Sequence, residues 1–288
     1  MPRCLLLLLA VIMAAASAEG HRLQPGDAHL YAYHMESRQE LTSAGETIAY
    51  TTQRSWLVLL RCDDVSDDEA TVVVQIYRIR ARHHGPGIDI AVDDEQTDDE
   101  ARPHPLLAGL LAPSRIPLTL RVDLSTGRVL DVSGYQAIQE AARELFADGF
   151  TEPVLNPSIE ESYGAEAWKR RWSEMLALPS AEDEIIDLAP IAAGQVRRQW
   201  SDHDYTLHMP TEPPQVTIHA EPKPVVLRLR SLEGSGSVTM RDGVLEERQA
   251  TLSYTVEGQA MTQSHTQQHH VTWHLRRLSP GSDDQQAP

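Results

Sequence analysis

Apolar and polar residues alternate with a period of two along most of the chain, a pattern that predicts β-strands with one buried face. Three such stretches, at residues 28–39, 46–62 and 71–82, occupy the first third. The turn Ser43-Ala44-Gly45 and the acidic residues 63–68 separate them, as turns separate antiparallel neighbours. We therefore expect these three strands to form a meander.

Between residues 83 and 117 the alternation stops, and Gly, Pro and acidic residues indicate a long surface excursion. Two strands are predicted after it, at residues 118–123 and 128–133, joined by Ser-Thr-Gly as a compact hairpin. The excursion contains an apolar patch long enough for one or two helical turns, made of Leu106, Leu107, Leu110 and Leu111.

A helical period replaces the alternation over about residues 135–178. The first expected helix covers about residues 135–147. The second begins at Ser158, which forms a capping-box pair with Glu161, and stops before Pro179. One apolar stripe follows the second helix and consists of Trp168, Trp172, Met175 and Leu176.

The remaining sequence returns to the two-residue period. Strands are predicted at residues 195–201, 205–209, 216–220, 225–232, 236–240, 245–256 and 267–278. Gly234-Ser235-Gly236-Ser237 is interpreted as a turn, and Asp242-Gly243 as a tight hairpin turn. The last ten residues, from Ser279 on, are polar and are expected to be disordered.

Strands, then helices, then strands again predict a mainly β protein of the α+β class. The expected architecture is a curved antiparallel sheet, or half-barrel, with an inserted helical segment. Residues 19–278 would form a single β-rich domain, and the helical insert at about residues 135–178 would fill the concave side of the sheet.

The first eighteen residues have the three parts of a cleavable signal peptide. Arg3 supplies the basic region, an apolar stretch too short to cross a bilayer follows, and Ala16-Ser17-Ala18 is a small-x-small cleavage site. An uncleaved membrane anchor is the alternative. We expect the mature protein outside the cytoplasm, periplasmic or secreted, with no transmembrane segment.

The chain is acidic, with a formal net charge of −17. Such a surface repels nucleic acid and anionic membranes at long range, so no nucleic-acid partner is expected. Cys62 is the single cysteine left after processing, which excludes an intramolecular disulfide. Because it ends the apolar run at residues 56–60, we expect it to be buried.

Two stretches carry a resemblance to known proteins. One is residues 106–138, with its core from Leu118 to Gly134, and the other runs from Gly234 to Leu245 and on through residues 251–258. Together with the opening Gly26-Asp27, they resemble a family of secreted bacterial proteins of unknown function, whose members look like the curved half-barrels of periplasmic lipoprotein carriers. The resemblance implies a concave side that holds an apolar ligand or a helix, and it brings no catalytic residues.

Histidines gather near the C-terminus at positions 265, 269, 270 and 274. On a strand, His270 and His274 share the solvent face and lie about 13 Å apart, too far to share an ion. His269 belongs to the opposite face. The acidic runs lack the spacing of a calcium loop, so neither a metal nor a cofactor is expected.

No sequence motif of a hydrolase, metalloprotease or nucleotide-binding enzyme is present, although a scattered Ser/His/Asp triad stays open as an alternative. The leading hypothesis is a non-enzymatic binding or carrier protein for an apolar ligand or lipid. The runner-up is an interaction module for another envelope protein. The expected ligand-binding residues are Leu106, Leu107, Leu110, Leu111, Trp168, Trp172, Met175 and Leu176, with packing of the core as the other reading.

Cleavage after Ala18 is the first testable prediction. N-terminal sequencing of the exported protein should start at Glu19, because Ala16 and Ala18 supply the small side chains at the cleavage site. Recovery of the protein in a membrane fraction with Met1 retained would contradict it.

Overall fold

The computed structural model describes eight segments of the chain: residues 20–95, 104–146, 159–180, 183–187, 195–209, 215–218, 225–260 and 263–279. The expected signal peptide, the cap at Ser158 and the tail after Ser279 lie outside them. Among the described residues the fold is mainly β, as predicted from the alternation.

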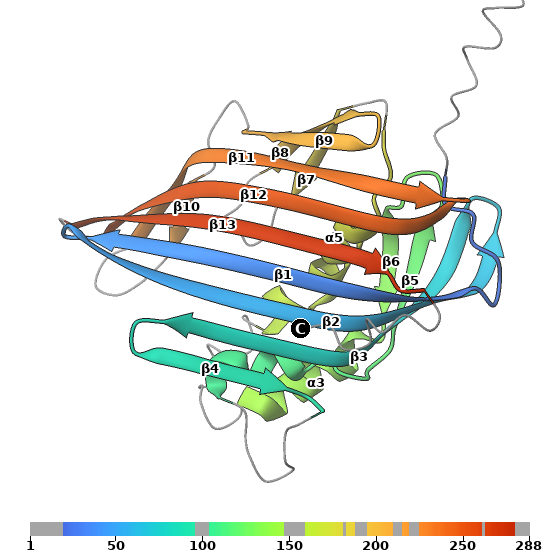
Figure 1. Ribbon diagram of the computed structural model, residues 1–288, viewed down its shortest axis with the longest axis horizontal. Coiled ribbons are helices and arrows are strands. Elements are labelled where there is room, and N and C mark those ends of the chain that lie inside the picture. The colour runs from blue at the N-terminus through green and yellow to red at the C-terminus, as the bar shows by residue number, and fades with distance from the viewer. Residues whose placement is uncertain are drawn as a thin grey trace, which may run out of the picture.

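Thirteen strands of these segments form one antiparallel sheet (Figure 1). They are β1 (Ala28–Ser43), β2 (Glu46–Ser66), β3 (Glu69–Gly85), β4 (Ile88–Asp93), β5 (Leu118–Asp123), β6 (Val129–Ser133), β7 (Glu184–Asp187), β8 (Gln195–Ser201), β9 (Asp204–His208), β10 (Gln215–Ile218), β11 (Val225–Arg241), β12 (Val244–Ala260) and β13 (Gln263–Arg277). Their order is β6-β5-β3-β2-β1-β13-β12-β11-β9-β8-β7, with β4 beside β3 and β10 beside β11. Because β1 pairs with β13, the first and last strands meet at the centre of the sheet.

The described helical segments are short. They are α2 (Pro105–Ala108), the 3₁₀ turn η1 (Gly109–Leu111), α3 (Tyr135–Phe146), residues 159–163 and α5 (Ala165–Leu176). Gly164 separates the last two and serves as the N-cap of α5. The predicted apolar patch therefore forms one turn of α-helix and one 3₁₀ turn, as its length allowed.

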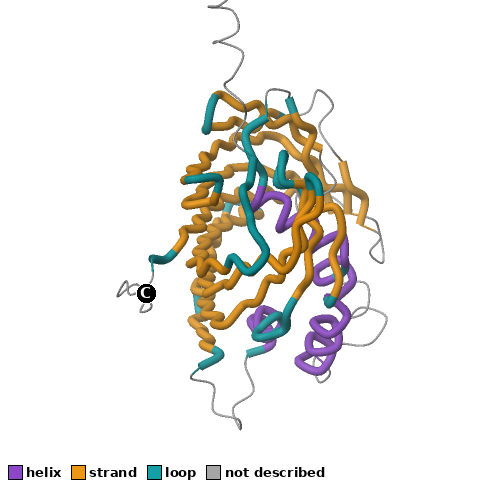
Figure 2. Tube along the Cα trace, turned by 90° about the vertical axis from the view of Figure 1, so that its right-hand side faces the viewer, coloured by secondary structure: helices purple, strands orange, loops and turns teal. Residues whose placement is uncertain are grey.

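The sheet is curved, and Figure 2 shows its strands in an arc rather than a flat layer. Residues paired across neighbouring strands share a face. Tyr33 pairs with Trp56 on β2 and with Leu275 on β13, and all three are buried. We call the face that carries them the inner face, because α5 packs against it.

The apolar face of α5 is part of the main core. Trp168 and Trp172 have no exposed surface, and Met175 and Leu176 are also buried. They lie in one cluster with the inner-face side chains Tyr31, Tyr33, Trp56, Val58, Ile79 and Leu275. The apolar stripe predicted from the sequence is thus the face by which α5 joins the sheet.

The β5–β6 hairpin contacts the C-terminal end of α5 and holds it in place. Gly127, in the turn, has φ +70°, and a Cβ added there would lie 1.8 Å from the Leu176 carbonyl oxygen. The backbone N–H of Leu178 donates to the Thr126 carbonyl at 2.9 Å. Only glycine combines this backbone conformation with so close an approach.

The interpretation of Gly234-Ser235-Gly236-Ser237 as a turn was wrong, because these residues lie inside β11, one continuous strand where two were predicted. A Cβ at Gly236 would lie 2.4 Å from the Tyr205 ring, and one at Gly234 would lie 2.8 Å from Leu207. The glycines therefore make room for side chains of β9, which pairs alongside. Two short strands, β4 and β7, were not predicted.

Replacing Trp172 by Ala should lower the free energy of unfolding by about 3–5 kcal/mol, because the whole indole is buried. Chemical denaturation of the purified protein measures the loss. Leu106→Ala is the matched control, since Leu106 is 62 % exposed and its truncation should change stability little. Equal losses in the two variants would contradict the assignment of α5 as core.

Candidate functional site

The inner face divides into two halves. The packed half lies under α5, and its cluster of apolar residues reaches as far as Met35 and Trp273. The open half begins at the next inner-face positions, Ser37 and Val271, and continues toward the hairpin that joins β1 and β2. Figure 1 shows the long strands extending well beyond α5 in that direction.

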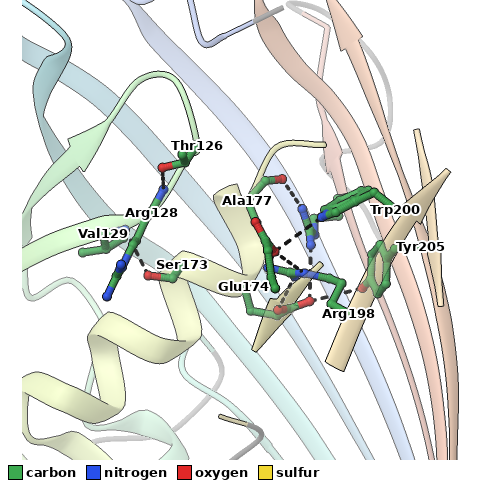
Figure 3. A network of polar contacts seen from close by, with 11 residues as sticks. Thr126, Arg128, Val129, Ser173, Glu174, Ala177, Arg198, Trp200 and Tyr205 are labelled. Atoms are coloured by element: carbon green, nitrogen blue, oxygen red, sulfur yellow. Dashed lines mark hydrogen bonds and ion pairs between the residues drawn. The ribbon is translucent and has the colours of Figure 1, made fainter. Parts of the chain in front are cut away.

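A buried polar network fastens the C-terminal part of α5 to the strands β8, β9 and β12 (Figure 3). Glu174 accepts hydrogen bonds from Arg198 at 2.8 Å, from Tyr205 at 3.1 Å and from Arg248 at 3.3 Å. Glu184 on β7 accepts a second bond from Arg198, at 2.8 Å. Two carboxylates thus face two guanidinium groups.

Electrostatics accounts for the burial of this network. Burial alone would lower the pKa of Arg198, but the neighbouring Glu174 and Glu184 outweigh it, so that the pKa is raised. Arg248 has no exposed surface, and it also donates to the Ala177 carbonyl just beyond α5. The charges compensate one another, and the network acts as an anchor for the helix.

The sequence-predicted ligand residues fall into two separate groups. Trp168, Trp172, Met175 and Leu176 belong to the core under α5, whereas Leu107 packs with Ala81 and Val92. Leu110 and Leu111 lie at the edge of that smaller cluster, and Leu111 also contacts the larger one. Leu106 is exposed. Their role in ligand binding stays a prediction.

Trp168 and Trp172 are fully buried in the core, and the cavity closest to the end of α5 is small. A cavity of about 30 Å³ lies next to Leu176 and Tyr31, lined also by Cys62, which is buried as predicted. This volume holds one or two water molecules. An apolar ligand would need room elsewhere on the inner face.

The open half offers half-buried apolar and aromatic side chains. Tyr254 and His269 stack with ring centroids 4.4 Å apart and planes inclined by 4°. Burial raises the pKa of Tyr254 to about 12 and lowers that of His269. Leu252 and Val271 pair across β12 and β13 next to them, and both are half-buried.

The opposite flank of the open half is more polar. Thr52 pairs with Ser37 and with His83, which places hydroxyl and imidazole groups on β1, β2 and β3. Tyr50 stacks on His83 with ring centroids 5.5 Å apart. Two guanidinium groups, those of Arg54 and Arg171, lie where the packed half meets the open half. Sequence patterning did not identify them.

A polar groove of about 570 Å³ lies among β1, β11, β12 and β13. Most of its lining residues, such as Arg38, Glu233 and His270, point away from the inner face by their register. His270 donates to or accepts from the Ser253 hydroxyl at 2.8 Å. Within the described segments, no three His, Cys, Asp or Glu side chains are grouped to hold a metal ion.

No helix in the described part of the chain is long and apolar enough to cross a membrane. No protein-family model matches the sequence, and no curated protein matches it.

Solved structures give distant likenesses only. A structure of lipovitellin and its lipid–protein interactions is 8 % identical with a TM-score of 0.41; the alignment covers 90 % of this chain but 26 % of lipovitellin. OpdQ of Pseudomonas aeruginosa is 6 % identical over 88 % of this chain and 100 % of its own, with a TM-score of 0.26. A DUF1329 family protein from Desulfovibrio piger is 8 % identical over 96 % and 93 %, with a TM-score of 0.15. At these scores, nothing about the function of this chain rests on them.

Removing the shared carboxylate of the network should destabilise the protein strongly. Glu174→Leu leaves the fully buried Arg248 without its carboxylate, and a broken buried pair typically costs about 3–5 kcal/mol. Denaturant unfolding measures this loss, and Glu174→Leu combined with Arg248→Met should recover much of it. Glu257→Ala, which breaks an exposed pair with Arg230, is the control and should change stability by less than about 1 kcal/mol.

Proposed function

We propose that this protein is a non-enzymatic binding protein that takes up an apolar molecule or acyl chain on the open half of its inner face. One observation carries the proposal: on the apolar flank of this half, Leu252, Tyr254 and Val271 are only half-buried. Leu252 and Tyr254 pack on one side against a second buried cluster, which includes Leu232 and Val256, and keep part of their surface accessible. Half-buried apolar surface inside a curve of sheet gains free energy when a ligand covers it.

The dimensions of the open half suit an acyl chain. The seven residues from Ile48 to Arg54 along β2 span about 20 Å. An acyl chain of a bilayer extends over about 15 Å, half of the hydrocarbon core. A chain of this length would lie parallel to the strands, with Tyr254 and Leu252 along one side.

In this proposal the packed half supports the ligand site and does not itself bind the ligand. Trp168 and Trp172 form a rigid wall beside the ligand, and the network around Glu174 holds that wall in place. The predicted export fits the same function, because an apolar molecule that moves between membranes outside the cytoplasm needs a protein to cover it.

A second candidate is an interaction module that binds another envelope protein by adding a strand to the sheet. Its support is the edge strand β7, where Ile185 is 70 % exposed. Exposed apolar residues on an edge strand favour pairing with another chain. This candidate predicts a protein partner and no uptake of small apolar molecules.

Titration with the neutral fluorophore N-phenyl-1-naphthylamine tests the first proposal. We expect saturable binding of one molecule per chain. Leu252→Gln should weaken it by about tenfold or more, because a polar amide then replaces an apolar contact. Thr251→Gln is the matched control, since the neighbouring side chain is exposed on the opposite face. Absence of saturable binding to the wild-type protein, or equal weakening in both variants, would contradict the proposal.

A further inference from the structure

Arg54 and Arg171, the arginine pair, approach each other from the sheet and the helix. Arg54 lies on the inner face of β2, paired with Met35 on one side and Ala81 on the other. Arg171 projects from α5, and its guanidinium lies 4.4 Å from the ring centroid of Trp168 and 5.8 Å from that of Trp56. The pair therefore lies at the boundary between the packed half and the open half.

Both guanidinium groups act on the same neighbours. Burial raises the pKa of Tyr33 to about 12, and the charges of Arg171 and Arg54 oppose this rise. The same two charges oppose the raised pKa of Tyr163. Burial lowers the pKa of Arg171, and the charge of Arg54 lowers it further, so the two cations repel each other.

Carboxylates compensate five other arginines that are buried or half-buried. Arg198 and Arg248 share Glu174, Arg78 and Arg80 share Asp93, and Arg277 pairs with Glu246. Arg54 and Arg171, which are not exposed, have neither an ion pair nor a hydrogen bond to another described residue. Two like charges held together without a counter-charge destabilise a fold.

Hydrogen-bond donors are also in excess around the arginine pair. The Nε of Arg54 and the indole N–H groups of Trp56 and Trp168 are buried, and no acceptor for them lies among the described residues. Buried donors are almost always paired in folded proteins. A cluster with two positive charges and several free donors is complementary to an oxyanion.

We propose that Arg54 and Arg171 bind the anionic head group of a single-chain amphiphile, whose acyl chain lies along the open half of the inner face. This inference rests on the proposed function and specifies its ligand class. Each guanidinium presents a planar fork of donors that matches the two oxygens of a carboxylate or phosphate. The head group supplies the missing counter-charge, and the chain covers Val271, Leu252 and Tyr254.

The net charge of the protein restricts the class of ligand further. With a formal net charge of −17, the surface as a whole repels an anionic bilayer. The arginine pair lies inside the curve of the sheet, where a membrane surface does not reach. A single anionic amphiphile taken out of the membrane satisfies both constraints.

Competition against N-phenyl-1-naphthylamine tests the inference with matched probes. Dodecanoate carries both the chain and the charge, dodecanol only the chain, and acetate only the charge. We expect dodecanoate to displace the fluorophore at a concentration at least tenfold lower than dodecanol, and acetate not to displace it. Arg54→Met and Arg171→Met should each remove the preference for dodecanoate, so that dodecanoate and dodecanol displace the fluorophore at the same concentration.

Stability distinguishes a binding role from a structural one. Because each substitution by Met removes a repelling charge, both variants should unfold at the same temperature as the wild type or higher. Arg54→Lys keeps the charge and should retain part of the preference, and Arg38→Met, an exposed arginine paired with Glu40, should retain all of it.

The outcomes separate the two proposals. If the wild type does not bind the fluorophore, the proposed function fails. If the fluorophore binds but dodecanoate and dodecanol compete equally, or if the Met variants keep the preference for dodecanoate, the head-group site alone is overturned. Displacement by acetate would show a site for free anions and overturn the amphiphile, and a lower unfolding temperature in both Met variants would assign the pair a structural role.

Discussion

The burial of α5 against the curved sheet is the interaction on which the rest of the structure depends. Trp168 and Trp172 lose all their exposed surface there, and each aromatic ring of that size buries on the order of 200 Å². The helix occupies one half of the inner face and so determines where the other half begins. Without it, the apolar side chains that it covers, among them Tyr33, Trp56 and Leu275, would be exposed on the inner face.

The position of that boundary follows from the register of the strands. Trp56 and Arg54 are two residues apart on β2, and therefore point to the same face, one under α5 and the other at its margin. The network around Glu174 fixes the helix from the opposite side, through strands of the C-terminal half. An amphipathic helix held at both sides has little freedom to slide, so the margin stays in place.

Much of this fold was predictable from the sequence, because a buried face leaves a two-residue period that tertiary context rarely hides. β1, β2, β8 and β13 were placed within a few residues, and the apolar stripe of α5 was identified as the surface that meets the sheet. The exceptions have physical causes. Gly234 and Gly236 are typical of turns, but here side chains from β9 lie over them, which requires knowing the neighbouring strand. β4 does alternate, but it lies in the stretch where Gly, Pro and acidic residues indicated a long surface loop, and β7 has only four residues.

The candidate site was harder to predict, because it depends on the lack of a carboxylate near Arg54 and Arg171. Arg54 shares its face with Trp56 by the two-residue period, but the unbroken apolar run from Trp56 to Leu60 does not show which face of β2 is buried. Nothing in a single sequence distinguishes an arginine with a carboxylate from one without. The carboxylates that pair with Arg198 are Glu174 on α5 and Glu184 on β7, whereas no described carboxylate pairs with Arg54. A fold that compensates five buried or half-buried arginines and leaves two adjacent ones uncompensated retains an electrostatic penalty that packing alone does not explain. An anionic ligand removes that penalty only while it is bound, which couples the stability of this end of the inner face to occupancy.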